Sequence, residues 1–382
     1  MMVRILADIG MVASLVGIVY LIAAAWLVRS FAREIPPPPQ ERPPVTILKP
    51  VCGDEPGLYD NLRSFCTQDY PEVQVVFGVR DPEDTAVPTI RRLMAALPGV
   101  AMDLVIDGRL HGTNYKVSNL INMMAVARHD ILVVADSDMR VGPDYLGVIV
   151  ASLLRPGVGA VTCLYTGRAS GNVWSILGAA WINATFLPSV LVGRAVGGVE
   201  GCFGATMALC RDTLNAFGGF EALRNHLADD YALGALVRRS GHAVVLAPHV
   251  PEHAVAEATP GELLRHELRW SRTIAAIAPV SFAASMITNP VALAVVAVAL
   301  AGGAPVAWGG LALAVACRFA TMRWIVHSLG CDPIPMWAIP PRDLLSFVTL
   351  VAAFFGRSVT WRGHRFRVGR DGLLIAEKSS LS

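Results

Sequence analysis

Two long apolar runs without a charged residue, one near each end of the chain, restrict its fold more than any other feature. They are Ile9–Val28 and Thr273–Cys317. Because about 20 apolar residues cross a bilayer as one helix, the first run predicts one membrane helix. The second predicts two helices, joined near Ala301–Pro305. The composition agrees, since hydrophobic residues make up 54% and charged residues 16% of the chain, which is too apolar for an ordinary soluble enzyme.

The surroundings of the first run indicate an anchor that is retained. A signal peptide has a shorter apolar run followed by a small-residue cleavage site, so we expect residues 1–33 to stay as a membrane helix. Arg29 and Arg33 follow the run, which places the next residues in the cytoplasm under the positive-inside rule. The Pro-rich residues 34–44 then predict an extended linker.

Residues 45–272 alternate short apolar strands with helical patterns. Strands are expected at Val45–Leu48, Val73–Val79, Ala101–Ile106 and Ile131–Val134. Helices are expected between them at Leu58–Cys66, Thr89–Leu97 and Lys116–Ala127. This alternation predicts an α/β domain built on a mostly parallel sheet with helices on both faces.

The fourth predicted strand leads directly into Asp136-Ser137-Asp138 and then into the turn residues Gly142-Pro143. Side chains alternate along an extended segment, so Asp136 and Asp138 share one face. They follow the carboxyl end of a buried strand, where ligands bind in open α/β sheets. A carboxylate pair suits a hard divalent cation that is shared with substrate phosphates. The alternative is a solvated Asp-rich turn.

Other polar residues fall near the same edge of the predicted sheet. Asp81 follows the second strand and is either a contact to a base or ribose or a turn residue before Pro82. Lys116 is either a partner for a diphosphate or a solvated helix residue. Asp229 and Asp230 begin a helix, where one carboxylate is often only an N-cap. The second, Asp230, is our candidate general base.

The C-terminal part carries further membrane signals. Arg269-Trp270 offers a guanidinium for phosphate and an indole for stacking, or belongs to a juxtamembrane basic helix. Trp174–Gly197 is either an amphipathic segment at the membrane surface or a buried helix pair. Residues 273–356 hold three apolar segments, and Pro and Arg/Asp residues interrupt Ile334–Phe355. A basic tail at 357–382 belongs inside, so we expect the interrupted segment not to span fully.

The net charge and the cysteine spacing argue against a nucleic-acid-binding protein and against a zinc protein. The formal net charge is +2, which gives no case for nucleic-acid binding. Seven cysteines show no spacing of a zinc site, so they are interpreted as reduced thiols in a reducing compartment.

Several stretches together resemble the ceramide glucosyltransferase-like branch of the family 2-type glycosyltransferases (family 21). They are TILKPVCGDEPGLYDNLRSFCTQDYPEVQVVFGVRDPED, HGTNYKVSNLINM, ADSDMRVGPDYL, HLADDYALG and HELRW. The runs CGDEPGLYDNLRSFC, ARHDILVVADSDMRV and LADDYALGALVRR are most similar to bacterial hopanoid-biosynthesis glycosyltransferases. Those enzymes are taken to place N-acetylglucosamine on bacteriohopanetetrol from UDP-N-acetylglucosamine.

The resemblance implies a GT-A fold and an inverting, metal-assisted transfer. Asp81 matches the aspartate that contacts the nucleotide. Asp138, with Asp136, matches the motif that binds the metal and diphosphate, with Mg²⁺ or Mn²⁺ as the metal. Asp230 matches the catalytic base.

The last matching stretch departs from the family in one position. His266, Arg269 and Trp270 match a (Q/R)xxRW motif, with His266 where Gln or Arg is usual. The resemblance therefore implies roles for Arg269 and Trp270 in catalysis and leaves the substrate contact of His266 open.

The expected partners are a UDP-sugar donor, a lipid acceptor and the lipid bilayer. The expected location is a bacterial inner membrane, with the catalytic domain in the cytoplasm. Bacteriohopanetetrol is the leading acceptor, and ceramide with UDP-glucose is the alternative. A processive polysaccharide synthase needs more helices after the HELRW stretch than this chain offers. A transporter or scaffold is disfavoured, because the ionisable residues gather in the α/β segment rather than inside the apolar runs.

Overall fold

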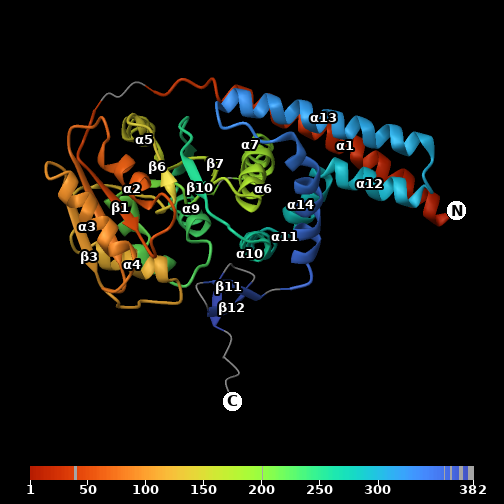
Figure 1. Ribbon diagram of the computed structural model, residues 1–382. Helices are drawn as coiled ribbons and strands as arrows, with labels where there is room; N and C mark the ends of the chain where they lie inside the picture. The colour runs from red at the N-terminus through yellow and green to blue at the C-terminus, as the bar shows by residue number, and fades with distance from the viewer. Residues whose placement is uncertain (38–40, 200, 357, 362–363, 370–372, 377–382) are drawn as a thin grey trace, which may run out of the picture.

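The computed structural model places an α/β domain beside an arm of long helices that leads away to the N-terminus (Figure 1). It describes residues 1–37, 41–199, 201–356, 358–361, 364–369 and 373–376. Residues 38–40 of the predicted linker, and residues 357, 362–363, 370–372 and 377–382 of the predicted tail, lie outside the described residues.

A seven-stranded sheet forms the centre of the α/β domain, in the order β3-β2-β1-β4-β8-β6-β9. Strands β3, β2, β1 and β4 are parallel to one another, β8 runs antiparallel to both β4 and β6, and β9 is parallel to β6. The predicted mostly parallel sheet is therefore confirmed. The strands are β1 Val45–Pro50, β2 Val73–Val79, β3 Ala101–Ile106, β4 Ile131–Val134, β6 Val158–Thr162, β8 Met207–Cys210 and β9 Ala243–Leu246.

Helices cover both faces of this sheet because strand residues alternate between two apolar cores. On one face, Ile47, Phe77 and Val133 pack with helices α2 Leu58–Cys66, α3 Ala86–Ala96 and α5 Tyr145–Leu153. On the other face, Leu48, Val76 and Leu132 pack with helices α4 Tyr115–Met123, α8 Arg211–Ala216 and α9 Asp229–Arg239, beside η2 Phe220–Leu223. Burial on both faces explains why these strands are continuous apolar runs.

A small second sheet lies next to the end of β4. It has the order β5-β10-β7, with β5 Met139–Arg140, β10 Glu252–Val255 and β7 Thr166–Ala169. Strand β10 pairs antiparallel with β5, which brings His253 opposite Met139. The backbone N–H of Ala254 donates to the carbonyl of Asp138 at 2.9 Å. This pairing fixes the backbone at Asp138.

The arm consists of α1 Met2–Phe31, α12 Pro290–Leu300 and α13 Pro305–Leu329. Helices α1 and α13 are long and apolar enough to cross a membrane. The segment Pro279–Thr288 (α11 Pro279–Ala284 and η3 Ser285–Thr288) passes the same test together with α12, but the pair is bent by 70°. A side chain at Gly17 would lie 2.5 Å from the carbonyl of Ile287, so this glycine permits close helix packing.

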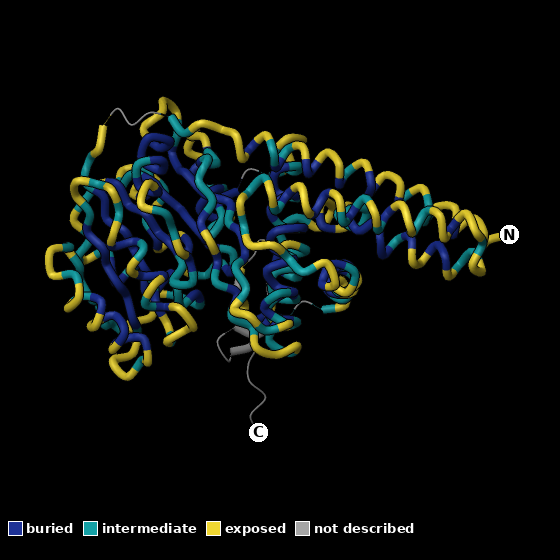
Figure 2. Tube along the Cα trace, turned by 45° about the horizontal axis from the view of Figure 1, so that its top comes forward, coloured by how far each residue is buried: buried dark blue, intermediate teal, exposed yellow. Residues whose placement is uncertain are grey.

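The outer surface of the arm is apolar, as a lipid-facing surface requires. Figure 2 shows exposed positions along the whole arm. Many of them are large hydrophobic side chains, including Val12, Val19, Trp26, Val296, Val306, Trp308 and Leu313. An exposed apolar surface of this kind marks a membrane or protein contact.

Further apolar helices lie between the arm and the α/β domain. Segment Val173–Ala195 consists of α6 Val173–Trp181, the π-helix η1 Ile182–Phe186 and α7 Leu187–Ala195, and it is also long and apolar enough to span. Within it, 61% of the most apolar window is buried inside the protein. Asn183 pins the π-helix, because its side chain accepts from the N–H of Gly167 at 2.7 Å and donates to the carbonyl of Gly167 at 3.0 Å.

Two helices connect the α/β domain to this apolar region, namely α10 Pro260–Ile277 and α14 Ile339–Ala353, which follows η4 Met336–Ala338. Helix α14 begins with Pro340-Pro341 in its first turn, where the missing N–H of proline costs nothing. The described part of the tail adds strands β11 Ser358–Trp361, β12 His364–Val368 and β13 Leu374–Ala376. Val359 and Phe366 of these strands pack against Leu227.

Candidate active site

A buried lysine joins carboxylates from two elements at the carboxyl edge of the main sheet. The ammonium of Lys116, in the first turn of α4, lies 2.7 Å from Asp136 Oδ1 and 3.3 Å from Asp229 Oδ2. Asn114 begins α4, since its side chain accepts from the N–H of Val117 at 3.1 Å. Only 15% of the Lys116 side chain is exposed. The interpretation of Lys116 as a solvated helix residue is therefore wrong.

Asp230 faces the same space as Asp136. The backbone N–H of Gly204 donates to Asp230 Oδ2 at 2.9 Å. A side chain at Gly204 would lie 2.9 Å from Asp136 Oδ2 and 3.6 Å from both Asp230 Oδ2 and Lys116 Nζ. The absence of a side chain at Gly204 thus lets these three groups come close to its backbone. No side chain caps α9, so the N-cap interpretation of Asp229 is wrong, and Asp229 instead pairs with Lys116.

Asp138 is held by a histidine from the second sheet. His253 Nε2 lies 3.1 Å from Asp138 Oδ2. Among the described residues, the buried Oδ1 of Asp138 has no hydrogen-bond partner. The sequence reasoning missed His253, because its position depends on the pairing of β10 with β5.

Lys49 contacts the backbone of the Asp136–Asp138 turn, and the sequence reasoning missed this residue too. Its ammonium donates to the carbonyl of Asp136 and lies 3.7 Å from the centroid of the Phe65 ring. Burial lowers the pKa of Lys49 to about 7, against the opposing charges of Asp138 and Asp136. The available signal was its position at the end of the first strand, which pairs with the fourth.

The surroundings of Asp230 and Asp138 shift the pKa values of these two carboxylates in opposite directions. Burial and then the charge of Asp229 raise the pKa of Asp230 to about 6, although Lys116 opposes this. Burial acts in the same direction on Asp138, but the charge and hydrogen bond of His253 outweigh it and lower the pKa of Asp138 to about 2. For Lys116, burial lowers the pKa, and the Asp136 and Asp229 carboxylates more than offset it, so the net shift is upward. One carboxylate is therefore suited to accept a proton, and another stays ionised.

The carboxylates of Asp136 and Asp138 can supply only some of the ligands that a divalent cation needs. Among the described residues, no three His, Cys, Asp or Glu side chains converge in a metal site. Asp136 and Asp138 still supply the hard oxygen ligands that Mg²⁺ and Mn²⁺ prefer, and Asp138 Oδ1 is buried without a partner. These residues fit a cation that takes its remaining ligands from substrate phosphates.

Helix α10 brings the HELRW residues to this region. His266 Nδ1 hydrogen-bonds to Glu257 Oε1, and the His266 ring centroid lies 4.0 Å from that of Trp270. Trp270 stacks on Trp181 of α6 at 5.1 Å. Burial, then the charges of Asp230, Asp138 and Asp136, raise the pKa of the Tyr165 hydroxyl, while Arg269 lowers it. Tyr165 therefore lies within electrostatic reach of both α10 and the aspartates.

Asp81 lies apart from this cluster. It is exposed after β2, and β1 separates β2 from β4. Its Oδ1 accepts from the backbone N–H of Glu83 at 3.0 Å, which is the turn geometry that the sequence left as an alternative. A nucleotide contact by Asp81 stays a prediction.

Comparisons with known proteins agree with this architecture. The chain is 21% identical to ceramide glucosyltransferase 1 of Caenorhabditis elegans over 96% of this chain and 80% of that protein. It is 34% identical to ceramide glucosyltransferase of Candida albicans over 28% of this chain and 22% of that protein. Its fold is similar to mannosyltransferase PcManGT from Pyrobaculum calidifontis, solved with GDP-Man and Mn²⁺. That match has a TM-score of 0.53 at 21% identity and covers 92% of this chain and 98% of the mannosyltransferase.

A family model that matches most of the chain shows to which protein family the chain belongs. The family model described as glycosyl transferase family 21 matches residues 9–374. This match covers both the α/β domain and the apolar helices of the arm. The chain belongs to glycosyl transferase family 21.

Proposed function

We propose that this chain transfers a sugar from a UDP-sugar to the hydroxyl of a membrane lipid at the cytoplasmic face of a bacterial inner membrane. One observation carries the proposal: Asp136, Lys116 and Asp230 converge around Gly204. In addition, helix α10 leads from this edge of the domain to the apolar helices. A lipid hydroxyl at the membrane surface can reach such a site without leaving the bilayer.

The donor diphosphate is proposed to bind beside Lys116 and Arg269. Lys116 and Arg269 supply positive charge, and Asp136 with Asp138 would hold Mg²⁺ or Mn²⁺. When bound, the cation neutralises charge that develops on the leaving diphosphate. The mannosyltransferase with the similar fold was solved with Mn²⁺, which supports a divalent metal here.

Asp230 is the proposed general base. Its pKa of about 6 leaves it ionised at neutral pH and basic enough to take the proton of the acceptor hydroxyl. Trp270, whose indole stacks on Trp181, is proposed to contact the acceptor, and His266 and Asp81 are proposed to contact the donor. A single base without a covalent enzyme intermediate gives inversion at the sugar carbon.

Two acceptors are supported by different observations. The runs that resemble hopanoid-biosynthesis enzymes favour bacteriohopanetetrol with UDP-N-acetylglucosamine. The similarity to ceramide glucosyltransferases of Caenorhabditis elegans and Candida albicans favours ceramide with UDP-glucose. We propose the hopanoid pair first and the ceramide pair as the alternative.

A transfer assay separates these proposals. Purified protein in membranes receives each UDP-sugar with each lipid, with and without EDTA, and mass spectrometry identifies the lipid products. An EDTA-sensitive N-acetylhexosamine adduct of bacteriohopanetetrol is the expected result. A hexose on ceramide would replace the acceptor and sugar but keep the reaction. Long glycans would indicate a polysaccharide synthase, and no lipid adduct from any pair would refute the proposed function.

A further inference from the structure

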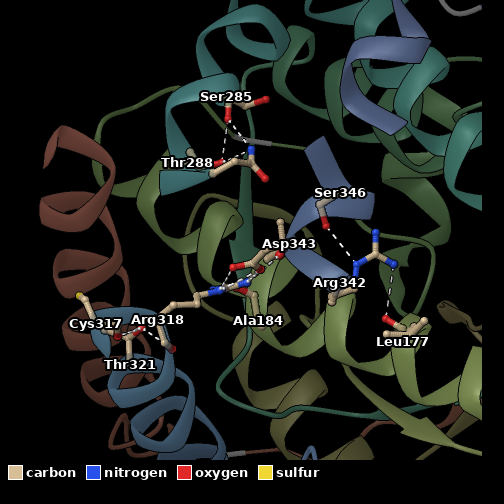
Figure 3. A network of polar contacts seen from close by, with 12 residues as sticks. Leu177, Ala184, Ser285, Thr288, Cys317, Arg318, Thr321, Arg342, Asp343 and Ser346 are labelled. Atoms are coloured by element: carbon tan, nitrogen blue, oxygen red, sulfur yellow. Dashed lines mark hydrogen bonds and ion pairs between the residues drawn. The ribbon is translucent and has the colours of Figure 1, made fainter. Parts of the chain in front are cut away.

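Two adjacent residues at the start of α14 form buried ion pairs with two different parts of the molecule. Arg342 pairs with Glu267 of α10, and Asp343 pairs with Arg318 of α13. At most 6% of any of these four side chains is exposed. We call these four residues the α14 clasp, part of which is shown in Figure 3.

The Asp343 side of the clasp holds a membrane helix. Arg318 donates from Nε to both Asp343 oxygens at 3.0 and 2.9 Å, and from Nη2 to Oδ1 at 2.7 Å. Its Nη1 donates to the carbonyl of Ala184 in the π-helix at 3.0 Å. Arg318 therefore ties α13 to α14 and to the segment that contacts the α/β domain through Asn183.

The Arg342 side of the clasp holds the HELRW helix. Arg342 donates two hydrogen bonds to the carboxylate of Glu267, one of them from Nη2 to Oε2 at 2.9 Å. Its Nε donates to Ser346 Oγ at 3.1 Å. This bidentate geometry fixes the orientation of both side chains as well as their separation.

Glu267 and Arg269 lie on opposite sides of α10. Helical residues advance by about 100° each, so two positions separate the side chains by about 200°. Because Glu267 faces Arg342, Arg269 is turned away from α14. The ion pair thus fixes the rotation of α10 about its axis, and with it the direction of Arg269 and Trp270.

Packing alone does not require buried charges at this contact. Apolar residues of the same volume are often as stabilising as a buried ion pair, whereas such a pair can specify one arrangement among several. Helix α10 has few fully buried positions, namely Leu263, Glu267 and Thr273. Only Leu263 among these residues is apolar, so the Glu267 pair adds a specific restraint on the rotation of α10 to the stacking of Trp270 on Trp181.

We propose that Arg342 and Glu267 are positioning residues, which set the rotation of α10 so that Arg269 and Trp270 meet the donor and the acceptor. The ion pair between Asp343 and Arg318 fixes the position of α14 relative to the membrane helix α13. The inference rests on the proposed transfer function.

The test compares rate per folded site in four variants: Glu267→Gln, Arg342→Met, Arg342→Lys and the double variant Glu267→Gln/Arg342→Met. Each is purified in detergent, and UDP with Mn²⁺ is used to count binding sites by calorimetry. The transfer rate at saturating donor is then divided by that count, and the KM for the donor is measured in parallel. Arg128→Met is the matched control, since Arg128 pairs with Asp103 at an exposed position.

We expect Glu267→Gln and Arg342→Met to lower the rate per site by about tenfold or more, with the donor KM nearly unchanged, because a misplacement of about 1 Å is enough for such a loss. Arg342→Lys should fall between the parent and Arg342→Met. The double variant should lose less than the sum of the single changes, because no charge is left unpaired. The control should match the parent.

Parent-like rates per site in every variant, with fewer sites, would overturn the inference and leave the pair a folding role only. If a single variant yields no UDP-binding protein, the same comparison is made with Arg342→Lys and the double variant. A parent that binds UDP but transfers no sugar refutes the proposed function instead, which keeps the two failures distinct.

Discussion

Replacing Lys116 with Met tests the electrostatic design of the site. Lys116 is the cation next to Asp136 and Asp229, and its charge also lowers the pKa of Asp230. Breaking a buried ion pair costs about 3–5 kcal/mol. Because 36% of the Asp136 side chain is exposed, solvent screens part of the repulsion, and we expect a loss of about 2–3 kcal/mol near neutral pH.

The pH dependence of this loss identifies its cause. Removal of the Lys116 charge raises the folded-state pKa values of Asp136 and Asp230 further above the unfolded value of about 4. The destabilisation is therefore full above the raised values and shrinks as the pH falls toward about 4. Bound Mn²⁺ should restore part of the stability, since it supplies positive charge to Asp136.

Thermal unfolding in detergent measures the effect. The midpoint of Lys116→Met should fall by about 5 °C or more at about pH 7.5 and by clearly less at about pH 5. Lys116→Arg, which keeps the charge, should lie close to the parent. An equal loss at both pH values would mean that lost packing, rather than carboxylate repulsion, causes the change, and our electrostatic reasoning would be refuted.

Three further predictions concern the reaction itself. Asp230→Asn should lower the transfer rate by about 10²–10⁴-fold with UDP binding retained; a parent-like rate would exclude Asp230 as the base. In the parent, kcat/KM should fall as the pH drops below the Asp230 pKa of about 6, because the protonated carboxyl accepts no proton, and a flat profile from about pH 5 to 8 would contradict this. Asp138→Asn should weaken Mn²⁺ binding measured by calorimetry by about tenfold or more, whereas Asp103→Asn, at the exposed ion pair, should leave it unchanged.

Local patterns were sufficient to predict the first four strands of the main sheet along the chain and the helices between them. The buried strand Ile131–Val134 and the helix Leu58–Cys66 have the bounds in the structure that the sequence indicates. The strand is an unbroken apolar run that ends before polar residues, and the helix has apolar residues at helical spacing, so tertiary contacts do not shift their ends. The sequence also placed Asp136, Lys116 and Asp230 near one edge of the sheet, and in the structure Lys116 and Asp230 reach Asp136 from the first turns of α4 and α9.

Residues whose position depends on distant pairing could not be predicted. His253 reaches Asp138 only because β10 pairs with β5. In α14, the sequence indicated that Pro340-Pro341 and Arg342-Asp343 interrupt an apolar segment. The prolines instead begin the helix, and the two charges are satisfied by Glu267 and Arg318. No local pattern reveals such partners.

The anomeric configuration of the glycolipid product shows whether the sugar is transferred by a single displacement. The proposed reaction uses one base, Asp230, and no covalent enzyme intermediate, so an α-linked UDP-sugar should give a β-linked glycolipid. Nuclear magnetic resonance of the purified lipid product reads the configuration from the coupling of the anomeric proton. A β-glycoside is the predicted result, and an α-glycoside would contradict the single displacement and the role of Asp230 as its base.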